Sequence, residues 1–209
     1  KFADLNQDGK IDRGAYTTAD PGDLTVIGNE TPRYCYGINL GFNWNGIGIS
    51  TFWQGVGKKD WYPRYDSGFF WGQYNRPFGY MLKQHTGDKV YREELDNWDT
   101  PYQTHQSSVN RPLTINNDRY MQDVSYIRLK NITVDYTFPD RICKRLHIKG
   151  LKVWVSGENL WTYSPMFEHC DNYDPEVINA GDSDFRTSEG DGYSYPMLRT
   201  VTLGVNLSF

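Results

Sequence analysis

Apolar and polar side chains alternate at the end of the chain, from Pro196 to Phe209, and only Arg199 interrupts the apolar series. From Thr200 onward, the opposite positions carry Thr, Gly, Asn and Ser. Successive side chains of a β-strand point to opposite faces, so this period of two predicts a strand with one apolar and one polar face. The apolar positions are Met197, Val201, Leu203, Val205, Leu207 and Phe209.

Further regions of the chain show the same alternation. Residues 34 to 44 repeat it almost position for position, the hairpin dipeptide Asn45–Gly46 follows, and residues 47 to 53 resume the pattern. Between residues 124 and 138 the apolar side chains change parity near Lys130 and Asn131, which predicts a β-bulge. Another strand begins at Leu151 and continues toward Tyr163.

The connections between these strands alternate in length. Gly57 to Arg119 and Ser164 to Tyr195 are long, whereas Asn45–Gly46 and Pro139–Gly150 are short, the second with room for one helical turn. Outer-membrane barrels have short periplasmic turns and long extracellular loops. The predicted organisation is an extracellular loop (1–32), a strand hairpin (33–56), a long extracellular loop (57–119), two strands with a periplasmic turn (120–163), an extracellular loop (164–195) and a final strand (196–209).

Composition agrees with strands that cross a membrane and excludes helices that do. The mean hydropathy is -0.71, and no stretch approaches the roughly 20 consecutive apolar residues of a spanning helix. A transmembrane barrel needs an apolar side chain only at every second position of each strand. Aromatic residues make up 16% of the chain, with 16 Tyr and 7 Trp, which suits the interfacial girdles and outer loops of a barrel.

The number of strands indicates that the chain is part of a longer polypeptide. About five strands cannot close a barrel, because the smallest outer-membrane barrels have about eight. The chain also starts at Lys1 within a motif. The polar parity is rich in Gly, Asn, Ser and Thr, which favours a wide polar lumen over a filled one. This interpretation favours a transport or receptor function.

Charge and candidate chemistry argue against several other functions. The 22 Lys and Arg against 26 Asp and Glu give a net charge of -4, and without a long basic run no nucleic-acid partner is expected. Cys35, Cys143 and Cys170 show no metal-binding spacing and are interpreted as isolated thiols. The dense cluster Glu168–Asp171 is expected to be solvated, and Glu158 to hydrogen-bond to a neighbouring strand. No catalytic triad, phosphate loop or zinc motif occurs, so no enzyme is predicted.

Four blocks of the sequence resemble the C-terminal part of SusC/RagA-family TonB-dependent outer-membrane transporters of Bacteroidetes. The resemblance implies an all-β fold, in which these residues are the last strands of a large antiparallel transmembrane β-barrel of about 22 strands. It also implies an N-terminal plug and preceding strands that are absent here, energisation by TonB, ExbB and ExbD, and a SusD-like surface lipoprotein acting as a lid. The implied function is uptake of oligosaccharides or peptides as nutrients. The blocks are Gly22–Trp61, Ser125–Pro139, Leu151–Pro165 and Tyr195–Phe209.

The segment DLNQDGKID near the start resembles a calcium loop. Oxygen ligands at alternate positions and Gly9 at the tight turn suit Ca²⁺, but Ala15 stands where an EF-hand has a bidentate Glu. Either a structural Ca²⁺ or an Asx-rich turn fits the pattern, and Asp20 or Asp23 would complete the shell. A similar block precedes the final strands in the resembling family. The candidate ligands are Asp4, Asn6, Asp8, Lys10 and Asp12.

Aromatic side chains crowd the first part of the long connection that begins at Gly57, interleaved with polar ones. Aromatic platforms beside hydrogen-bonding groups suit sugar rings and peptides, and they equally suit packing of the loop or contact with the lid protein. The candidate substrate-binding residues are Trp61, Tyr65, Phe69, Phe70 and Trp71.

The terminal strand also predicts an assembly signal, carried by Leu203, Val205, Leu207 and Phe209. One alternative function stays open, a soluble calcium-stabilised β-sheet module that binds glycans. The two functions differ in what the apolar parity faces. In the transporter it faces lipid on every strand, and in the module it faces one protein core.

Overall fold

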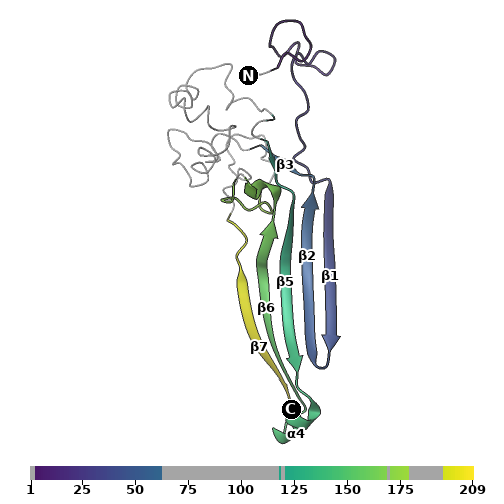
Figure 1. Cartoon of the computed structure of the whole chain (residues 1–209), viewed down its shortest axis with the longest axis vertical. Coiled ribbons are helices and arrows are strands. Elements are labelled where there is room, and N and C mark those ends of the chain that lie inside the picture. Colours follow the sequence, from purple (N-terminus) through teal and green to yellow (C-terminus); the bar gives the residue numbers. More distant parts are fainter. Residues whose placement is uncertain (1–2, 63–117, 119–120, 169, 179–194) are drawn as a thin grey trace. The chain divides into compact units, whose positions relative to one another are not determined.

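Five antiparallel strands form one sheet in the order β1-β2-β5-β6-β7 (Figure 1). The structure is a computed structural model that describes residues 3–62, 118, 121–168, 170–178 and 195–209. The prediction of an all-β antiparallel fold is confirmed. The strands are β1 (Tyr34–Trp44), β2 (Ile47–Gly57), β5 (Tyr126–Thr137), β6 (Gly150–Tyr163) and β7 (Thr200–Ser208).

The remaining described elements are short. β3 (Asp60–Trp61) pairs with β4 (Gln122–Asp123), α4 (Asp140–Arg145) lies between β5 and β6, and the 3₁₀ helix η3 (Pro165–Glu168) follows β6. None of the helices in the described part of the chain is long and apolar enough to cross a membrane.

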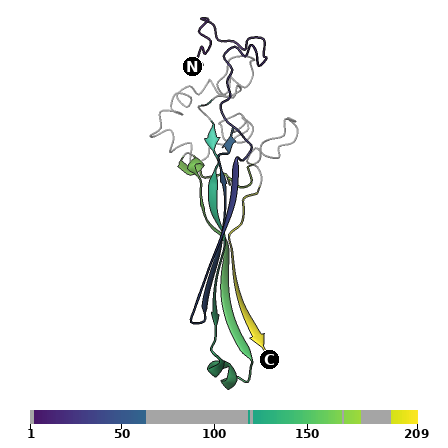
Figure 2. The ribbon, with the colours of Figure 1, turned by 90° about the vertical axis from the view of Figure 1, so that its right-hand side faces the viewer.

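The chain divides into two compact units. One unit comprises Lys1–Gly28 and Tyr62–Met121, and the other comprises Asn29–Trp61 and Gln122–Phe209. All the strands in the described residues lie in the second unit, called here the sheet unit. Figure 2 shows its five long strands in a single twisted layer.

The β-bulge predicted near Lys130 is present. Trp53 pairs with Leu129 and Phe52 with Asn131, so Lys130 has no partner on β2. The extra residue reverses the parity of β5, which keeps Leu129 and Ile132 on the same face. Without the bulge, half of this strand would turn its apolar side chains to the polar face.

The turn between β1 and β2 follows from its two residues. Asn45 and Gly46 have φ angles of 47° and 85°, as a two-residue hairpin turn with both central residues left-handed requires. A Cβ atom at position 46 would lie 2.7 Å from the Thr137 carbonyl oxygen, so glycine also permits close approach to the end of β5.

The last strand begins later than the alternation predicts, at Thr200 rather than Pro196. The Met197 amide donates to the Asp174 carboxylate at 2.9 Å, and the Asn159 side-chain amide donates to the Leu198 carbonyl at 3.0 Å. These side chains replace the hydrogen bonds of strand pairing, because β6 departs from regular pairing where Asn159 takes a positive φ of 53°.

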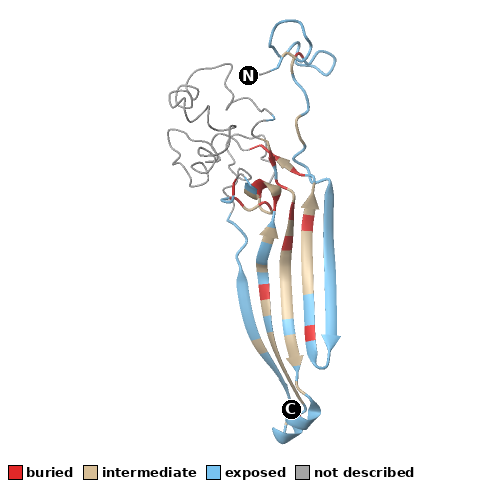
Figure 3. Cartoon of the chain, in the orientation of Figure 1, coloured by how far each residue is buried: buried red, intermediate tan, exposed pale blue. Residues whose placement is uncertain are grey.

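The buried apolar side chains of the sheet unit gather mainly at the end of the sheet where the long connections start and finish (Figure 3). They come from β3, from η3 and from the segments next to β5 and η3, so these short elements and segments pack on one another at this end. β1 is exposed along its whole length. The residues of this cluster are Trp61, Val124, Met166, Cys170, Tyr173, Pro175 and Ile178.

Candidate functional site

Apolar side chains form continuous rows across all five strands on one face of the sheet, called here the apolar face. One row joins β1 to β7 through consecutive pairs of opposite residues, and every member is exposed, from 38% for Val134 to 78% for Leu203. Side chains on directly opposite residues point to the same face of a sheet. The row consists of Phe42, Ile49, Val134, Val155 and Leu203.

Aromatic side chains border the apolar face at both of its ends. At the end with the long connections, Trp53 and Trp161 meet edge to face with ring centroids 5.9 Å apart, and Tyr34, Tyr36 and Tyr163 lie nearby in the register. At the opposite end, the Tyr136 and Phe138 ring centroids are 4.9 Å apart. Trp44 lies in the same row as Tyr136, two strands away, and Phe209 follows the end of β7.

The distance between the two aromatic bands can be estimated along β1. Ten residues separate Tyr34 from Trp44, which corresponds to a rise of about 34 Å. A strand tilted by about 40° covers roughly 26 Å of that along the membrane normal, close to the apolar band of about 25 Å on outer-membrane barrels. The spacing of the bands therefore fits one bilayer.

The opposite face of the sheet, called here the polar face, carries small and polar side chains. Asp135 and Lys152 form an ion pair at 2.9 Å, and Trp154 donates from its indole nitrogen to the Asn206 side chain at 3.2 Å. The Trp154 ring lies over Gly204, where a Cβ atom would overlap it. One row of opposite residues across all five strands consists of Gly41, Ser50, Thr133, Ser156 and Thr202.

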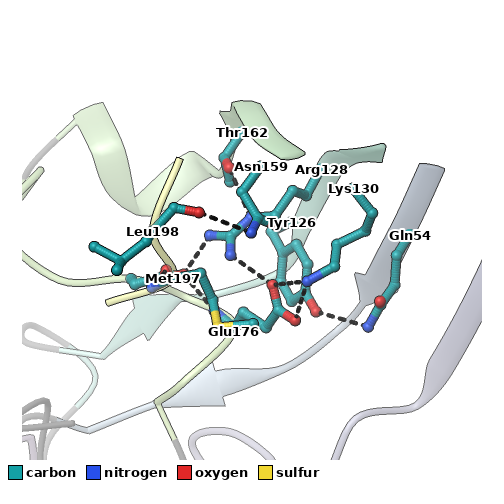
Figure 4. A network of polar contacts seen from close by, with 10 residues as sticks. Gln54, Tyr126, Arg128, Lys130, Asn159, Thr162, Glu176, Met197 and Leu198 are labelled. Carbon is teal, nitrogen blue, oxygen red and sulfur yellow. Dashed lines mark hydrogen bonds and ion pairs between the residues drawn. The ribbon is translucent and has the colours of Figure 1, made fainter. Parts of the chain in front are cut away.

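A buried cluster of charges lies on the polar face near the long connections (Figure 4). Arg128 is 3% exposed, and its guanidinium donates to Glu176 at 2.5 Å, to the Asp174 carboxylate and to the Thr162 hydroxyl at 2.8 Å. Lys130 contacts the second Glu176 oxygen at 2.8 Å. The two cations, Arg128 and Lys130, are thus matched by two carboxylates, Asp174 and Glu176. This pairing matters because an unpaired buried charge would cost several kcal/mol.

These charges fix the segment from Cys170 to Ile178 on the polar face. Asp174 also accepts the backbone amide of Glu176 at 3.0 Å, which forms an Asx turn. At the end of the segment, the buried ammonium of Lys59 donates to the Ile178 carbonyl. Burial lowers the pKa of Lys59, although the nearby Glu30 carboxylate opposes this effect. The segment therefore covers part of the polar face beside Arg128.

The predicted site residues are placed only in part. Trp61 is 2% exposed and packs against Tyr173, with ring centroids 5.3 Å apart. Leu203, Val205, Leu207 and Phe209 are exposed, the first three in the rows of the apolar face. The other four candidate substrate-binding residues, Tyr65, Phe69, Phe70 and Trp71, lie outside the described residues.

Two details of the polar segments differ from expectation. Cys170 is buried at 1% exposure rather than solvated, because η3 folds back and the Cys170 amide donates to the Met166 carbonyl at 2.8 Å. Sequence reasoning also missed the charge cluster. The available signal was two cations, Arg128 and Lys130, close together in a predicted strand whose only other charged residue is Asp135.

In the unit that contains Lys1–Gly28, called here the N-terminal unit, the calcium-like segment forms a series of Asx turns. Asp4 accepts the Gly9 amide at 2.8 Å, Asn6 accepts the Asp8 amide at 3.1 Å, and Asp8 accepts the Lys10 amide at 2.8 Å. Gly9 has a φ of 81°, as the tight-turn position requires. The second carboxylate oxygen of Asp4 is buried and has no hydrogen-bond partner.

Asp23 closes this loop from a position later in the sequence. Its carboxylate accepts the Leu5 amide at 2.6 Å and the Asp12 amide at 2.8 Å. The hydrogen bond from Asp12 is the main reason why the pKa of Asp23 is lowered. Within the described residues, no group of three or more His, Cys, Asp or Glu side chains is arranged to hold a metal ion. The calcium prediction therefore stays a prediction.

Comparison with known proteins gives relatives along the whole chain. No protein-family profile matches. "TonB-dependent receptor P3" of Formosa agariphila is 29% identical over 216 residues, and "TonB-dependent receptor P26" of the same organism is 26% identical over 223 residues. Each alignment covers 100% of this chain and 19% of the relative, so the chain spans about a fifth of the length of the curated relatives it matches.

Solved structures with a similar fold include the RagAB peptide importer in its 'closed-closed' state, with a TM-score of 0.53 and 20% identity over 97% of this chain and 20% of that one. A second is the RagAB peptide transporter, with a TM-score of 0.51 and 19% identity over 88% of this chain and 18% of that one. The matched proteins are receptors and transporters rather than enzymes, in agreement with the expectation that this chain is not an enzyme.

Proposed function

We propose an import function from the premise that this chain is part of a TonB-dependent receptor of the SusC/RagA type. The complete receptor would carry oligosaccharides or peptides across the bacterial outer membrane. The observation that carries this proposal is the exposed apolar face, which continues over all five strands opposite a polar face.

Lipid is the environment that fits the apolar face. A soluble protein rarely leaves so large a continuous apolar surface in water, and among the described residues no second layer covers it. The outer edges of β1 and β7 also need partners, because no water is present in a bilayer to satisfy their backbone groups. Strands from the rest of the receptor would supply these partners and close the barrel.

The connections support one orientation. Asn45–Gly46 and the α4 connection lie at one end of the sheet, with the C-terminal Phe209, and the strands lead into and out of the long connections at the other end. Short turns face the periplasm in outer-membrane barrels, so the α4 end would be periplasmic. The segment Cys170–Ile178 would then line the lumen near its extracellular mouth, because it lies on the polar face.

The partners follow from the same proposal. The plug and remaining strands of the same polypeptide would complete the channel, TonB with ExbB and ExbD would energise it, and a SusD-like lipoprotein would cover the extracellular mouth. The RagAB structures concern peptides, which makes a peptide one of the two substrate classes proposed here, beside an oligosaccharide. The aromatic candidates Trp61, Tyr65, Phe69, Phe70 and Trp71 would lie on the extracellular side.

A structural calcium ion in the N-terminal unit is a separate proposal. Support comes from the unpartnered Asp4 oxygen and from the turn geometry around Gly9. Isothermal titration of the receptor with terbium in place of calcium should give a binding signal, and Asp4→Asn should abolish this signal while Asp171→Asn leaves it intact. Equal signals from both variants would contradict the proposal.

Neighbouring substitutions on opposite faces test the membrane proposal. Ile132 lies on the apolar face, in the row midway between the aromatic bands, and Thr133 lies on the polar face. In the full-length receptor, Ile132→Arg should cost about 2–4 kcal/mol because it exposes a cation to lipid. Its recovery in the outer-membrane fraction should fall well below that of Thr133→Arg. Equal recovery of the two variants would favour the soluble module.

A further inference from the structure

Basic side chains cluster in the connection between β5 and β6, at the end of the sheet opposite the long loops. Four Lys or Arg and one His lie within nine residues, against the single acid Asp140, although the chain as a whole is acidic. All five side chains are exposed, and Figure 3 colours the helix α4 in this connection mostly as exposed. Among the described residues no ion pair involves any of them. This cluster, called here the basic turn, consists of Arg141, Lys144, Arg145, His147 and Lys149.

The position of the basic turn is fixed by the strands on either side. The Phe138 amide donates to Leu151 at 2.9 Å, and the Lys149 amide donates to Ser208 at 2.7 Å, so both ends of the connection are tied to the sheet. Buried Cys143 holds α4 against this end through a 3.8 Å contact with the Phe138 carbonyl. The basic turn therefore lies directly beyond the aromatic band formed by Trp44, Tyr136, Phe138 and Phe209.

Local helix stability explains only part of this charge. Lys144 and Arg145 lie in the last turn of α4, where cations complement the helix dipole. Arg141 lies in the first turn, where a cation is unfavourable, and Lys149 lies outside the helix. Two apolar side chains of the same connection, Ile142 and Leu146, are also exposed, at 40% and 56%. Cations beside exposed apolar groups are typical of surfaces that lie in a membrane interface.

We propose that the basic turn binds the phosphate groups of anionic phospholipids in the periplasmic leaflet. The inference rests on the proposed membrane function, which puts the aromatic band at the interface and the basic turn at headgroup level. Ile142 and Leu146 enter the acyl boundary, while the long basic side chains reach the phosphates. The bound lipids thereby determine the depth at which this end of the barrel lies in the membrane.

Lipid binding to the full-length receptor tests the proposal. The receptor, purified in a non-ionic detergent, is titrated with dioleoyl phosphatidylglycerol or dioleoyl phosphatidylcholine, and native mass spectrometry counts the bound lipid. The wild type should prefer phosphatidylglycerol, and added salt should weaken the preference. Lys144→Gln/Arg145→Gln should reduce it by about fivefold for each cation removed, or roughly 25-fold in all.

Two control variants separate charge from other effects. Arg33→Gln/Lys58→Gln removes two exposed cations at the opposite end of the sheet and should keep the preference. Lys144→Arg/Arg145→Lys preserves the charge and should also keep it. The proposal is overturned if the wild type shows no preference for phosphatidylglycerol, or if Arg33→Gln/Lys58→Gln loses as much of this preference as Lys144→Gln/Arg145→Gln. It is also overturned if Lys144→Gln/Arg145→Gln keeps the full preference. The last result would place the lipid-binding site elsewhere on the receptor.

The two proposals fail in different ways. If the transport proposal is wrong, the wild-type receptor is missing from the outer-membrane fraction. If only the headgroup proposal is wrong, the receptor is present there but binds both lipids alike.

Discussion

The Arg128 guanidinium donates a 2.5 Å hydrogen bond to the carboxylate of Glu176, which lies 48 positions later in the sequence. The bond joins the polar face of β5 to the connection that follows β6. Because Arg128 is buried, water cannot solvate its charge, and its carboxylate partners must compensate it. Removing one partner of a buried ion pair costs about 3–5 kcal/mol, since it leaves the other charge uncompensated.

Asp174 is the residue whose loss should release this segment most. It accepts hydrogen bonds from Arg128, from the Glu176 amide and from the Met197 amide. In the full-length receptor, Asp174→Ala should speed hydrogen exchange in peptides covering residues 170–178 and 195–199. The matched control is Asp171→Ala, because Asp171 is exposed. Exchange that is equally slow in both variants would show that the charge cluster does not anchor the segment.

Gly204 and Trp154 should depend on each other. The indole ring occupies the space that a side chain at position 204 would need. Gly204→Ala should therefore lower the free energy of unfolding of the full-length receptor, by about 1–3 kcal/mol if the ring is forced from its position. The fraction of folded receptor should fall accordingly. Trp154→Ser combined with Gly204→Ala should restore folding, measured by heat-modifiable gel mobility. A double variant no better than Gly204→Ala would rule out this contact as the cause.

Phe209 is expected to act in assembly. It ends the apolar series of the last strand and is 80% exposed. Deletion of Phe209 from the full-length receptor should sharply reduce insertion into the outer membrane, whereas Phe209→Tyr should preserve it, because the ring is kept at the terminus. Surface labelling of intact cells measures the inserted receptor. Unchanged labelling of the deletion variant would argue against an assembly signal.

Asp23 should make the N-terminal unit sensitive to acid. Its pKa in the folded state is lowered from the ordinary value of 3.8, chiefly by the Asp12 amide. A depressed carboxyl pKa contributes stability above the unfolded pKa, and this stability is lost as the pH falls through the folded pKa. The protection of the Leu5 and Asp12 amides against exchange, relative to an unfolded chain at the same pH, should therefore fall below about pH 4, and Asp23→Asn should remove most of this pH dependence. The same loss of protection in the variant would assign it to another group.

Much of the sheet could be predicted from the sequence because its signal is local. The period of two places the strands, Asn45–Gly46 places the hairpin, and the parity change near Lys130 places the bulge. Each of these features depends on neighbouring residues, whose side chains must point to one face or the other. The contrast in length between connections is equally visible in the sequence.

The charge cluster and the start of β7 required the tertiary structure. Arg128 meets Asp174 across 46 positions, and Pro196 to Arg199 stay outside the strand because Asn159 and Asp174 take up their backbone groups. Trp61, predicted as a substrate platform, is buried because Tyr173 folds against it. Alternation cannot encode such contacts, because it records which face a side chain takes and not which distant residue meets it there. The sequence by itself determined the two faces of the sheet, and only folding decided what covers the polar one.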